Sequence, residues 1–180
     1  MIRMSIQPII DLEKWHKKKD PWGYEKSSED RKRKNILISE IPSRKYKRVL
    51  DIGCGQGFIT KDLPGENIIG VDISRQAILH AKKINKKGMK FVEGSLYEFD
   101  VLFKGKSFDL IIITGVLYPQ YIGNSNNLIY KIIDDLLVEN GILVCVHIDD
   151  WYKSRFPYLL VNQNIYDYKE YLHRLEVYVK

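Results

Sequence analysis

Apolar and polar residues form two kinds of pattern along the chain, one typical of buried strands and the other of the helices that cover them. Short, almost wholly apolar runs predict five strands, at residues 48–52, 67–72, 90–93, 108–114 and 142–148. The last two runs are continuous, as in strands that are buried on both faces. Capping serines, apolar residues at helical spacing and following glycine or proline predict intervening helices, at residues 27–41, 57–63, 75–86 and 127–138.

Strands that alternate with helices along the chain in this way predict a parallel sheet with right-handed crossovers. The C-terminal segment differs from this pattern. Residues 151–160 are compatible with a helix that Pro157 interrupts, and the aromatic-rich residues 166–180 predict one or two antiparallel strands at the sheet edge. We therefore expect an α/β fold with a mostly parallel sheet of seven or six strands, helices on both faces and an antiparallel C-terminal edge.

Length and composition fit one domain of this kind. The chain has 180 residues, 44% hydrophobic and 29% charged, which is enough to bury a sizeable core. We expect a single domain over residues 1–180, with an N-terminal arm and helix at 1–45 as a potential lid and the core at 46–180. No apolar run reaches membrane-spanning length, and no signal peptide is recognisable. Cys54 and Cys145 are expected to stay reduced, which favours a cytoplasmic protein. We also expect that the protein does not bind membranes.

The formal net charge is +6, and the positive residues cluster at 17–19, 31–34, 44–48 and 82–87. Such clusters can bind nucleic acid. They lack the interleaved aromatic residues of single-strand binders, so we interpret them, residues 31–34 included, as solvated surface. Four scattered histidines and two separated cysteines show no metal-ligand spacing, and we expect no metal site.

Acidic residues and glycines gather where the first two predicted strands end. Asp51 ends the first strand and is followed by Gly53, Gly55 and Gly57, and Asp72 ends the second. Ligands of open α/β sheets bind beyond the carboxyl ends of the strands. The glycines let the backbone approach a ligand where a Cβ would clash. Asp72 is placed to accept hydrogen bonds from two ribose hydroxyls.

The spacing argues against a dinucleotide. Its fingerprint is Gly-x-Gly-x-x-Gly without an acid two residues earlier, whereas this chain has Asp-x-Gly-x-Gly-x-Gly from Asp51. Asp51 would repel a pyrophosphate but would suit an ammonium group. Ile73 can pack against a flat base, and a helix starting near Phe58 would offer free N–H groups. The sequence thus favours a nucleoside that carries an amino acid.

The same segments resemble a known family. Residues 49–58, 69–74, 91–95 and 108–116 resemble, in order, the first four motifs of class I S-adenosylmethionine-dependent methyltransferases, over roughly residues 20–180. The resemblance implies a Rossmann-like fold and S-adenosylmethionine as cofactor. The segment Asp20-Pro21-Trp22-Gly23-Tyr24 before a basic helix, with Val116-Leu117-Tyr118, resembles more narrowly the nodulation N-methyltransferase branch, which methylates saccharides or related metabolites.

Matching positions imply roles for particular residues. Gly53 and Gly55 would face the methionine part of the cofactor, Asp51 its ammonium group and Asp72 its ribose. Ser95 stands where the family usually has an aspartate, so adenine contact through Ser95 or the Leu96 backbone would have less charge assistance. The other expected cofactor contacts are Cys54, Ile73, Thr114 and Tyr24. Trp22 and Tyr24 would close over the cofactor as a lid or, alternatively, attach the arm to the body.

A methyl group on a sulfonium is already activated, so the protein has mainly to position an acceptor and exclude water. An amine acceptor need only be neutral, whereas a hydroxyl acceptor benefits from a general base. Tyr118 and His147 are the candidate catalytic residues. Tyr118 could instead serve packing, and His147 could be a hydrogen-bonded core histidine. Asp149 and Asp150 are further candidates or the cap of a following helix.

The expected function is methyl transfer from S-adenosylmethionine to an N or O atom of a small metabolite, with a saccharide or amino-sugar derivative favoured, by a monomer or homodimer. Two alternatives stay open. The basic clusters suggest an RNA or DNA methyltransferase, although residues 114–119 lack the Asn/Asp-Pro-Pro-aromatic signature that grips a flipped base. Ser95 and the lack of an unambiguous base also fit a non-catalytic cofactor-binding subunit.

Overall fold

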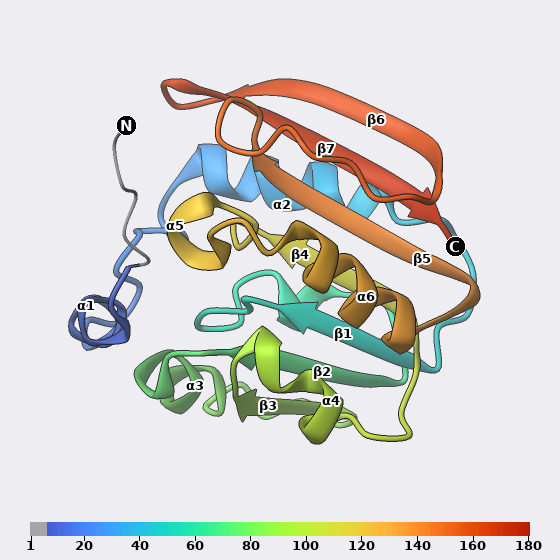
Figure 1. Cartoon of the computed structure of the whole chain (residues 1–180). Coiled ribbons are helices and arrows are strands. Elements are labelled where there is room, and N and C mark those ends of the chain that lie inside the picture. Colours follow the sequence, from blue (N-terminus) through green and yellow to red (C-terminus); the bar gives the residue numbers. More distant parts are fainter. Residues whose placement is uncertain (1–6) are drawn as a thin grey trace.

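The computed structural model describes residues 7–180 and contains a seven-stranded sheet of order β3-β2-β1-β4-β5-β7-β6 (Figure 1). The strands are β1 (Arg48–Ile52), β2 (Asn67–Asp72), β3 (Met89–Glu93), β4 (Phe108–Thr114), β5 (Leu137–Ile148), β6 (Leu159–Tyr168) and β7 (Tyr171–Val179). Neighbouring strands from β3 to β5 pair in parallel, whereas β7 is antiparallel to both β5 and β6. The expected Rossmann-like fold with an antiparallel C-terminal edge is confirmed.

Helices cover both faces of this sheet (Figure 1). They are α1 (Ile9–His16), α2 (Ser28–Glu40), α3 (Arg75–Ala81), α4 (Phe99–Leu102), α5 (Pro119–Ile122) and α6 (Asn126–Leu136), with 3-10 turns η1 (Thr60–Asp62) and η2 (Leu96–Glu98). The predicted caps are confirmed: the Ser27 side chain accepts a hydrogen bond from the Asp30 amide, and that of Ser74 from the Ala77 amide.

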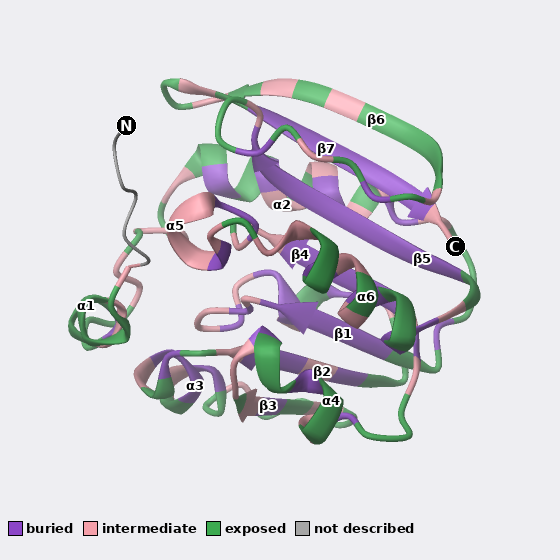
Figure 2. Ribbon diagram, in the orientation of Figure 1, coloured by how far each residue is buried: buried purple, intermediate pink, exposed green. Residues whose placement is uncertain are grey.

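Alternate residues of β4 pack into core clusters on opposite faces of the sheet. Ile111 and Ile113 pack in the cluster that includes Ile133 of α6, whereas Ile112 packs in the cluster that includes Leu37 of α2. This placement explains why the strand is apolar throughout, since both of its sides are covered. Figure 2 shows the contrast between buried β4 and the outer strand β6, which is largely exposed.

Several predicted boundaries are wrong. Residues 57–63 form only the single turn η1, because Gly57 has a φ of +83° in a turn closed by its amide on the Cys54 carbonyl. The helix predicted to Lys86 ends at Ala81. Residues 137 and 138, predicted as the end of a helix, belong to β5, and residues 151–160 form no helix. Leu137 pairs with Phe108, and Leu159 and Leu160 pair with β7, so strand pairing prevails over local propensity at these positions.

The N-terminal arm lies at the carboxyl ends of the strands. Glu13 of α1 accepts a hydrogen bond from the Gln76 amide of α3, at 3.4 Å, and the Gln7 amide donates to the Gln120 carbonyl at 2.8 Å. Residues 1–6 of the expected arm lie outside the described residues, and the single-domain division at residue 45 stays a prediction. Within residues 7–180, no helix has the length and apolarity needed to cross a membrane.

Candidate functional site

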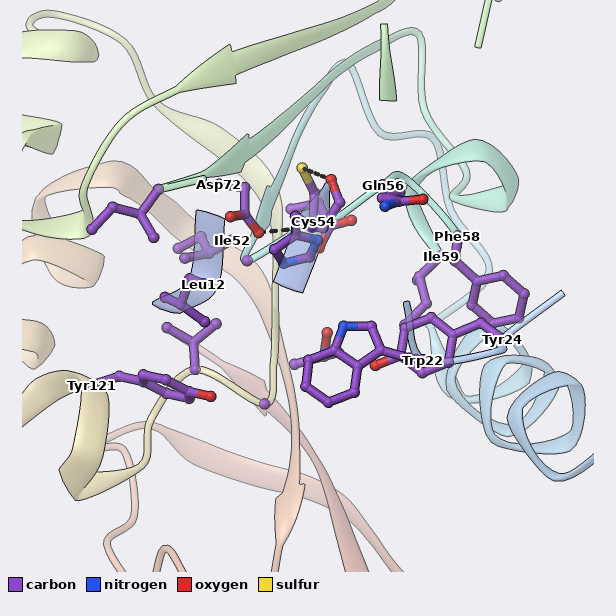
Figure 3. A pocket seen from close by; sticks show the side chains of 18 of the residues that line it. Leu12, Trp22, Tyr24, Ile52, Cys54, Gln56, Phe58, Ile59, Asp72 and Tyr121 are labelled. Atoms are coloured by element: carbon purple, nitrogen blue, oxygen red, sulfur yellow. Dashed lines mark hydrogen bonds between the residues drawn. The ribbon is translucent and has the colours of Figure 1, made fainter. Parts of the chain in front are cut away.

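A cavity of about 1090 Å³ opens where the carboxyl ends of the parallel strands meet the N-terminal arm and the β6–β7 hairpin (Figure 3). This volume is slightly above the range typical of a pocket for one small molecule, so the cavity has room for two reactants. Most of the predicted site residues line it: Tyr24, Asp51, Gly53, Cys54, Gly55, Asp72, Ile73, Ser95, Leu96, Thr114 and Tyr118.

Asp51 presents a buried carboxylate to this cavity. One of its oxygens, Oδ2, accepts a hydrogen bond from the Thr60 hydroxyl at 2.6 Å. The other, Oδ1, is buried and has no hydrogen-bond partner among residues 7–180. Burial raises the pKa of Asp51 to about 7, against the lowering by Thr60. A buried carboxylate oxygen without a partner is costly, and a cationic N–H donor would relieve that cost.

Asp72 is held by backbone amides. Its Oδ2 accepts from the Gly55 amide and its Oδ1 from the Ser74 amide, each at 2.8 Å. Burial raises the pKa of this carboxyl, and these two hydrogen bonds oppose the rise. Each oxygen keeps a further lone pair, so Asp72 can still accept hydrogen bonds from two hydroxyls. The two amides fix its orientation before any ligand arrives.

Glycines after β1 serve two different purposes. A Cβ on Gly53, which has a φ of +75°, would lie 2.2 Å from Cγ2 of Val116, so this glycine allows close packing. Gly55 also has a positive φ, +53°, but a Cβ there would meet no atom within 4 Å among the described residues. Gly55 therefore leaves open space beside the Asp72 carboxylate, which a ligand can approach.

The remaining predicted cofactor contacts lie along the cavity wall beyond β2 and β3. The Ser95 side chain accepts from the Tyr97 amide at 3.3 Å and caps η2, while its own amide donates to Glu98 at 2.9 Å. Ser95 is thus engaged in a capping box and offers fewer free lone pairs to an adenine than an aspartate would. Ile73 lines the cavity and is 39% exposed, so its side chain is accessible to a ligand.

Residues 20–24 form a turn that presents aromatic rings to the cavity. The Asp20 side chain accepts from the amides of Tyr24, at 2.7 Å, and Glu25, at 3.0 Å. Trp22 stacks 6.3 Å from Tyr24, and Tyr24 lies 5.3 Å from Phe58 (Figure 3). The arm therefore lines the cavity and is attached to the body, and its role as a lid stays a prediction.

Tyr118 lies in the cavity wall and has a defined hydrogen bond. Its hydroxyl oxygen accepts from the Ile148 amide at 2.9 Å, which leaves the phenolic proton available for a further partner. Burial raises the pKa of Tyr118 to about 12. The residue can therefore donate a hydrogen bond to a ligand, but it is not a base at neutral pH.

His147 does not line the cavity. It is 2% exposed, its Nε2 lies 3.3 Å from Oε2 of Glu176, and its ring packs 4.8 Å from that of Tyr152. This placement fits the alternative of a core histidine rather than a catalytic role. Asp149 pairs with Arg174 and with Lys153, and no helix follows for it to cap.

Sequence reasoning missed several residues that line the cavity. Arg33, expected to be solvated, is 8% exposed, and His16, next to the basic residues 17–19, is 6% exposed. Tyr168 reaches the cavity from the β6–β7 hairpin. His173 of the same hairpin, for which the sequence allows either an acceptor-site or a strand-surface role, lines the cavity and is 6% exposed. For Arg33 a signal existed, because Asp30, Arg33 and Leu37 share one helical face, and Leu37 is apolar.

The arrangement can bind a cation at Asp51, hydroxyls at Asp72 and a second molecule near Tyr118. No group of three or more His, Cys, Asp or Glu residues within 7–180 is placed to hold a metal ion. The aromatic turn and the hairpin line the space between these groups. Chemistry that brings two bound reactants together is therefore possible here.

Comparison with known proteins identifies the family. The methyltransferase domain family matches residues 43–178, and the chain belongs to it. The N-methyltransferase NodS of Bradyrhizobium japonicum WM9, crystallised with S-adenosyl-L-homocysteine, superposes with a TM-score of 0.82 at 19% identity, covering 96% of this chain and 97% of that one. The magnesium protoporphyrin IX methyltransferase of Synechocystis, crystallised with S-adenosylmethionine, gives 0.70 at 14% identity, covering 99% of this chain and 100% of that one. The expected resemblance to class I methyltransferases and to the nodulation branch is confirmed.

The curated relatives are longer than this chain. The malonyl-[acyl-carrier protein] O-methyltransferase of Legionella pneumophila is 26% identical over 136 residues, which are 68% of this chain and 47% of the relative. The ubiquinone biosynthesis O-methyltransferase of Pelagibacter ubique is 28% identical over 121 residues, 66% of this chain and 49% of the relative. The chain thus spans about half the length of these relatives, and their acceptors differ from one another.

Proposed function

We propose that this protein transfers a methyl group from S-adenosylmethionine to an N or O atom of a small metabolite. The observation that carries the proposal is the Oδ1 atom of Asp51, a buried carboxylate oxygen without a partner among residues 7–180, beside a cavity that Asp51 and Asp72 both line. The cofactor of the proposed reaction carries both an ammonium group and a ribose. Membership of the methyltransferase domain family supports the same assignment.

The residues present fit this cofactor. Asp51 would hold the ammonium group, Asp72 the ribose hydroxyls, and the open space at Gly55 would admit the methionine part. Ile73 and Leu96 would pack against the base, with Ser95 at its rim. When bound, S-adenosylmethionine supplies a methyl group on a positively charged sulfur. Asp51 and Asp72 fix its two ends, so the protein contributes mainly orientation.

The acceptor would occupy the part of the cavity beside Tyr118. The hydroxyl of this residue, held by the Ile148 amide, would donate a hydrogen bond to the acceptor and orient it. Trp22 and Tyr24 would exclude water on the arm side. Because Tyr118 stays protonated, it is a positioning residue in this scheme, and a neutral amine would need no further base.

For the acceptor we propose a saccharide or amino-sugar derivative. The rings of Tyr118, Trp151 and Tyr171 form a chain with centroid distances of 5.3 Å, and all three line the cavity. Such rings can pack against the C–H faces of a sugar. We further propose a cytoplasmic protein, supported by the free thiols of Cys54 and Cys145, acting as a monomer or homodimer.

Calorimetry with S-adenosylhomocysteine and, separately, NAD tests the cofactor assignment. We expect one-to-one binding of the nucleoside and none of the dinucleotide, and the reverse preference would overturn the proposal. Transfer of labelled methyl groups into a metabolite extract by the purified chain tests catalysis and excludes a non-catalytic subunit. Methylation of tRNA, with salt-sensitive binding, would instead support the RNA methyltransferase alternative.

A further inference from the structure

An arginine is buried at the end of the cavity formed by the arm and the hairpin. Arg33 of α2 lines the cavity and is 8% exposed. Its guanidinium carbon lies 5.3 Å from the ring centroid of Tyr24 and 5.3 Å from that of Tyr168, so an aromatic ring from each of two distant segments flanks it. The rings stabilise the cation and hold its orientation, but they accept none of its N–H groups in the plane.

The hydrogen bonding of Arg33 is incomplete. A guanidinium has five N–H donors, and the described residues provide one acceptor, Oδ1 of Asp30, at 3.3 Å from Nη2. The Nε of Arg33 is buried and has no partner among residues 7–180. The same Asp30 oxygen also accepts a hydrogen bond from the Tyr168 hydroxyl at 2.6 Å. Buried charged donors without acceptors are costly, which indicates that a ligand completes this site.

The ionisable groups around Arg33 restrict the kind of ligand. Asp30 is the buried carboxylate beside it, and Lys169, whose Nζ lies 3.9 Å from Oδ2 of Asp30, is exposed to solvent. Burial, followed by the nearby charge of Arg33, lowers the pKa of His173 to about 4, so this histidine is neutral. Burial likewise raises the pKa of Tyr24 to about 12, so it provides no phenolate. The carboxylates of Glu25 and Glu170 also line the cavity, but both residues are exposed and screened by solvent.

We propose that the methyl acceptor carries a carboxylate and that Arg33 binds it. This inference rests on the proposed function and specifies its substrate class. A carboxylate has the planar, two-oxygen geometry that matches a guanidinium fork, and its oxygens would accept from the N–H groups of Arg33 that have no partner among residues 7–180. Since Arg33, Tyr118, Asp51 and Asp72 line one cavity, the acceptor and the cofactor would share it.

A purely structural role for Arg33 makes a different prediction. As a link between α2, the arm and the hairpin, Arg33 would affect stability but would not distinguish an anionic from a neutral ligand. Matched probes separate the two roles. We choose D-glucuronate with D-glucuronamide, and benzoate with benzamide, because each pair differs mainly in the charge of one group and the two pairs distinguish a saccharide from an aromatic acceptor.

Each probe is titrated by NMR into protein saturated with S-adenosylhomocysteine. At least one carboxylate should bind about tenfold more tightly than its amide. The Arg33→Gln variant should abolish that preference, and Arg33→Lys, which keeps the charge and loses the fork, should retain only part of it. Lys32→Gln is the matched control, since Lys32 is exposed on the same helix, and the preference should persist in it.

Calorimetry with S-adenosylhomocysteine on the same samples reports folding and the proposed function separately. The nucleoside affinity of Arg33→Gln should stay within about twofold of the wild type, and if that variant does not fold, Arg33→Lys decides the question. Equal binding of both members of each pair, binding of no probe at millimolar concentration, or a preference that survives Arg33→Gln would overturn the inference. If the wild type does not bind the nucleoside, the proposed function fails, and the titrations are repeated without it to test the Arg33 site alone.

Discussion

Replacing Asp51 by asparagine should stabilise the protein in the absence of ligand and weaken its cofactor binding. The carboxylate of Asp51 is fully buried with one oxygen lacking a partner among residues 7–180, and its pKa rises from an ordinary 3.8 to about 7. In the unfolded chain it loses its proton near pH 4, and in the folded protein near pH 7. Between these values the folded protein binds the extra proton, so its stability falls as the pH rises.

The magnitude follows from this shift of about three pKa units. Between pH 4 and 7, Asp51 should reduce the free energy of unfolding by about 1.4 kcal/mol for each pH unit, which amounts to about 4 kcal/mol in total. Above pH 7 this reduction should stay constant. Asp51→Asn carries no such charge. The difference in unfolding free energy between variant and wild type should therefore grow over this range and then stay constant.

Urea denaturation at pH 5, 6, 7 and 8 measures this difference. Asp100→Asn is the control, because Asp100 is exposed and its difference from the wild type should not change with pH in this way. In the same Asp51→Asn protein, S-adenosylhomocysteine should bind at least about tenfold more weakly, through loss of the ammonium–carboxylate pair. A stability difference that does not depend on pH, or an unchanged affinity, would refute the reasoning.

Four further substitutions test three separate parts of the account. Asp72→Ala should weaken binding of S-adenosylhomocysteine by at least about tenfold in calorimetry, and an unchanged affinity would remove the ribose assignment. Gly53→Ala should cost more unfolding free energy than Gly55→Ala, by about 1–3 kcal/mol in urea titrations, because only its Cβ overlaps Val116, whereas Gly55→Ala should weaken nucleoside binding by filling open space. Loss of the contact with Glu176 in His147→Asn should lower stability but leave nucleoside affinity unchanged, and a large loss of affinity would return His147 to the site.

The sequence predicts the centre of the sheet better than its margins. The bounds of β1, β2 and β4 agree with the prediction because these strands are covered on both faces and their apolar runs end where the cover ends. Leu137 joins a strand by pairing with Phe108, and residues 159–165 do so by pairing with β7, and no local pattern contains these contacts. The length of β5 and the start of β6 therefore could not be read from the sequence.

The cofactor end of the cavity could also be predicted from the sequence better than the acceptor end. Asp51 and Asp72 with their glycines are local in the sequence, and their spacing alone places them together. Arg33, by contrast, stands within a run of four basic residues and resembles solvated surface. Its burial depends on Tyr168, which lies far along the chain in the hairpin that closes the cavity. The acceptor end is thus a product of tertiary structure.

A crystal structure with S-adenosylhomocysteine tests the central claim most directly. The account predicts that the amino group of the nucleoside donates to Oδ1 of Asp51 and that its ribose hydroxyls donate to Asp72. Ordered nucleoside density that contacts neither carboxylate would contradict it.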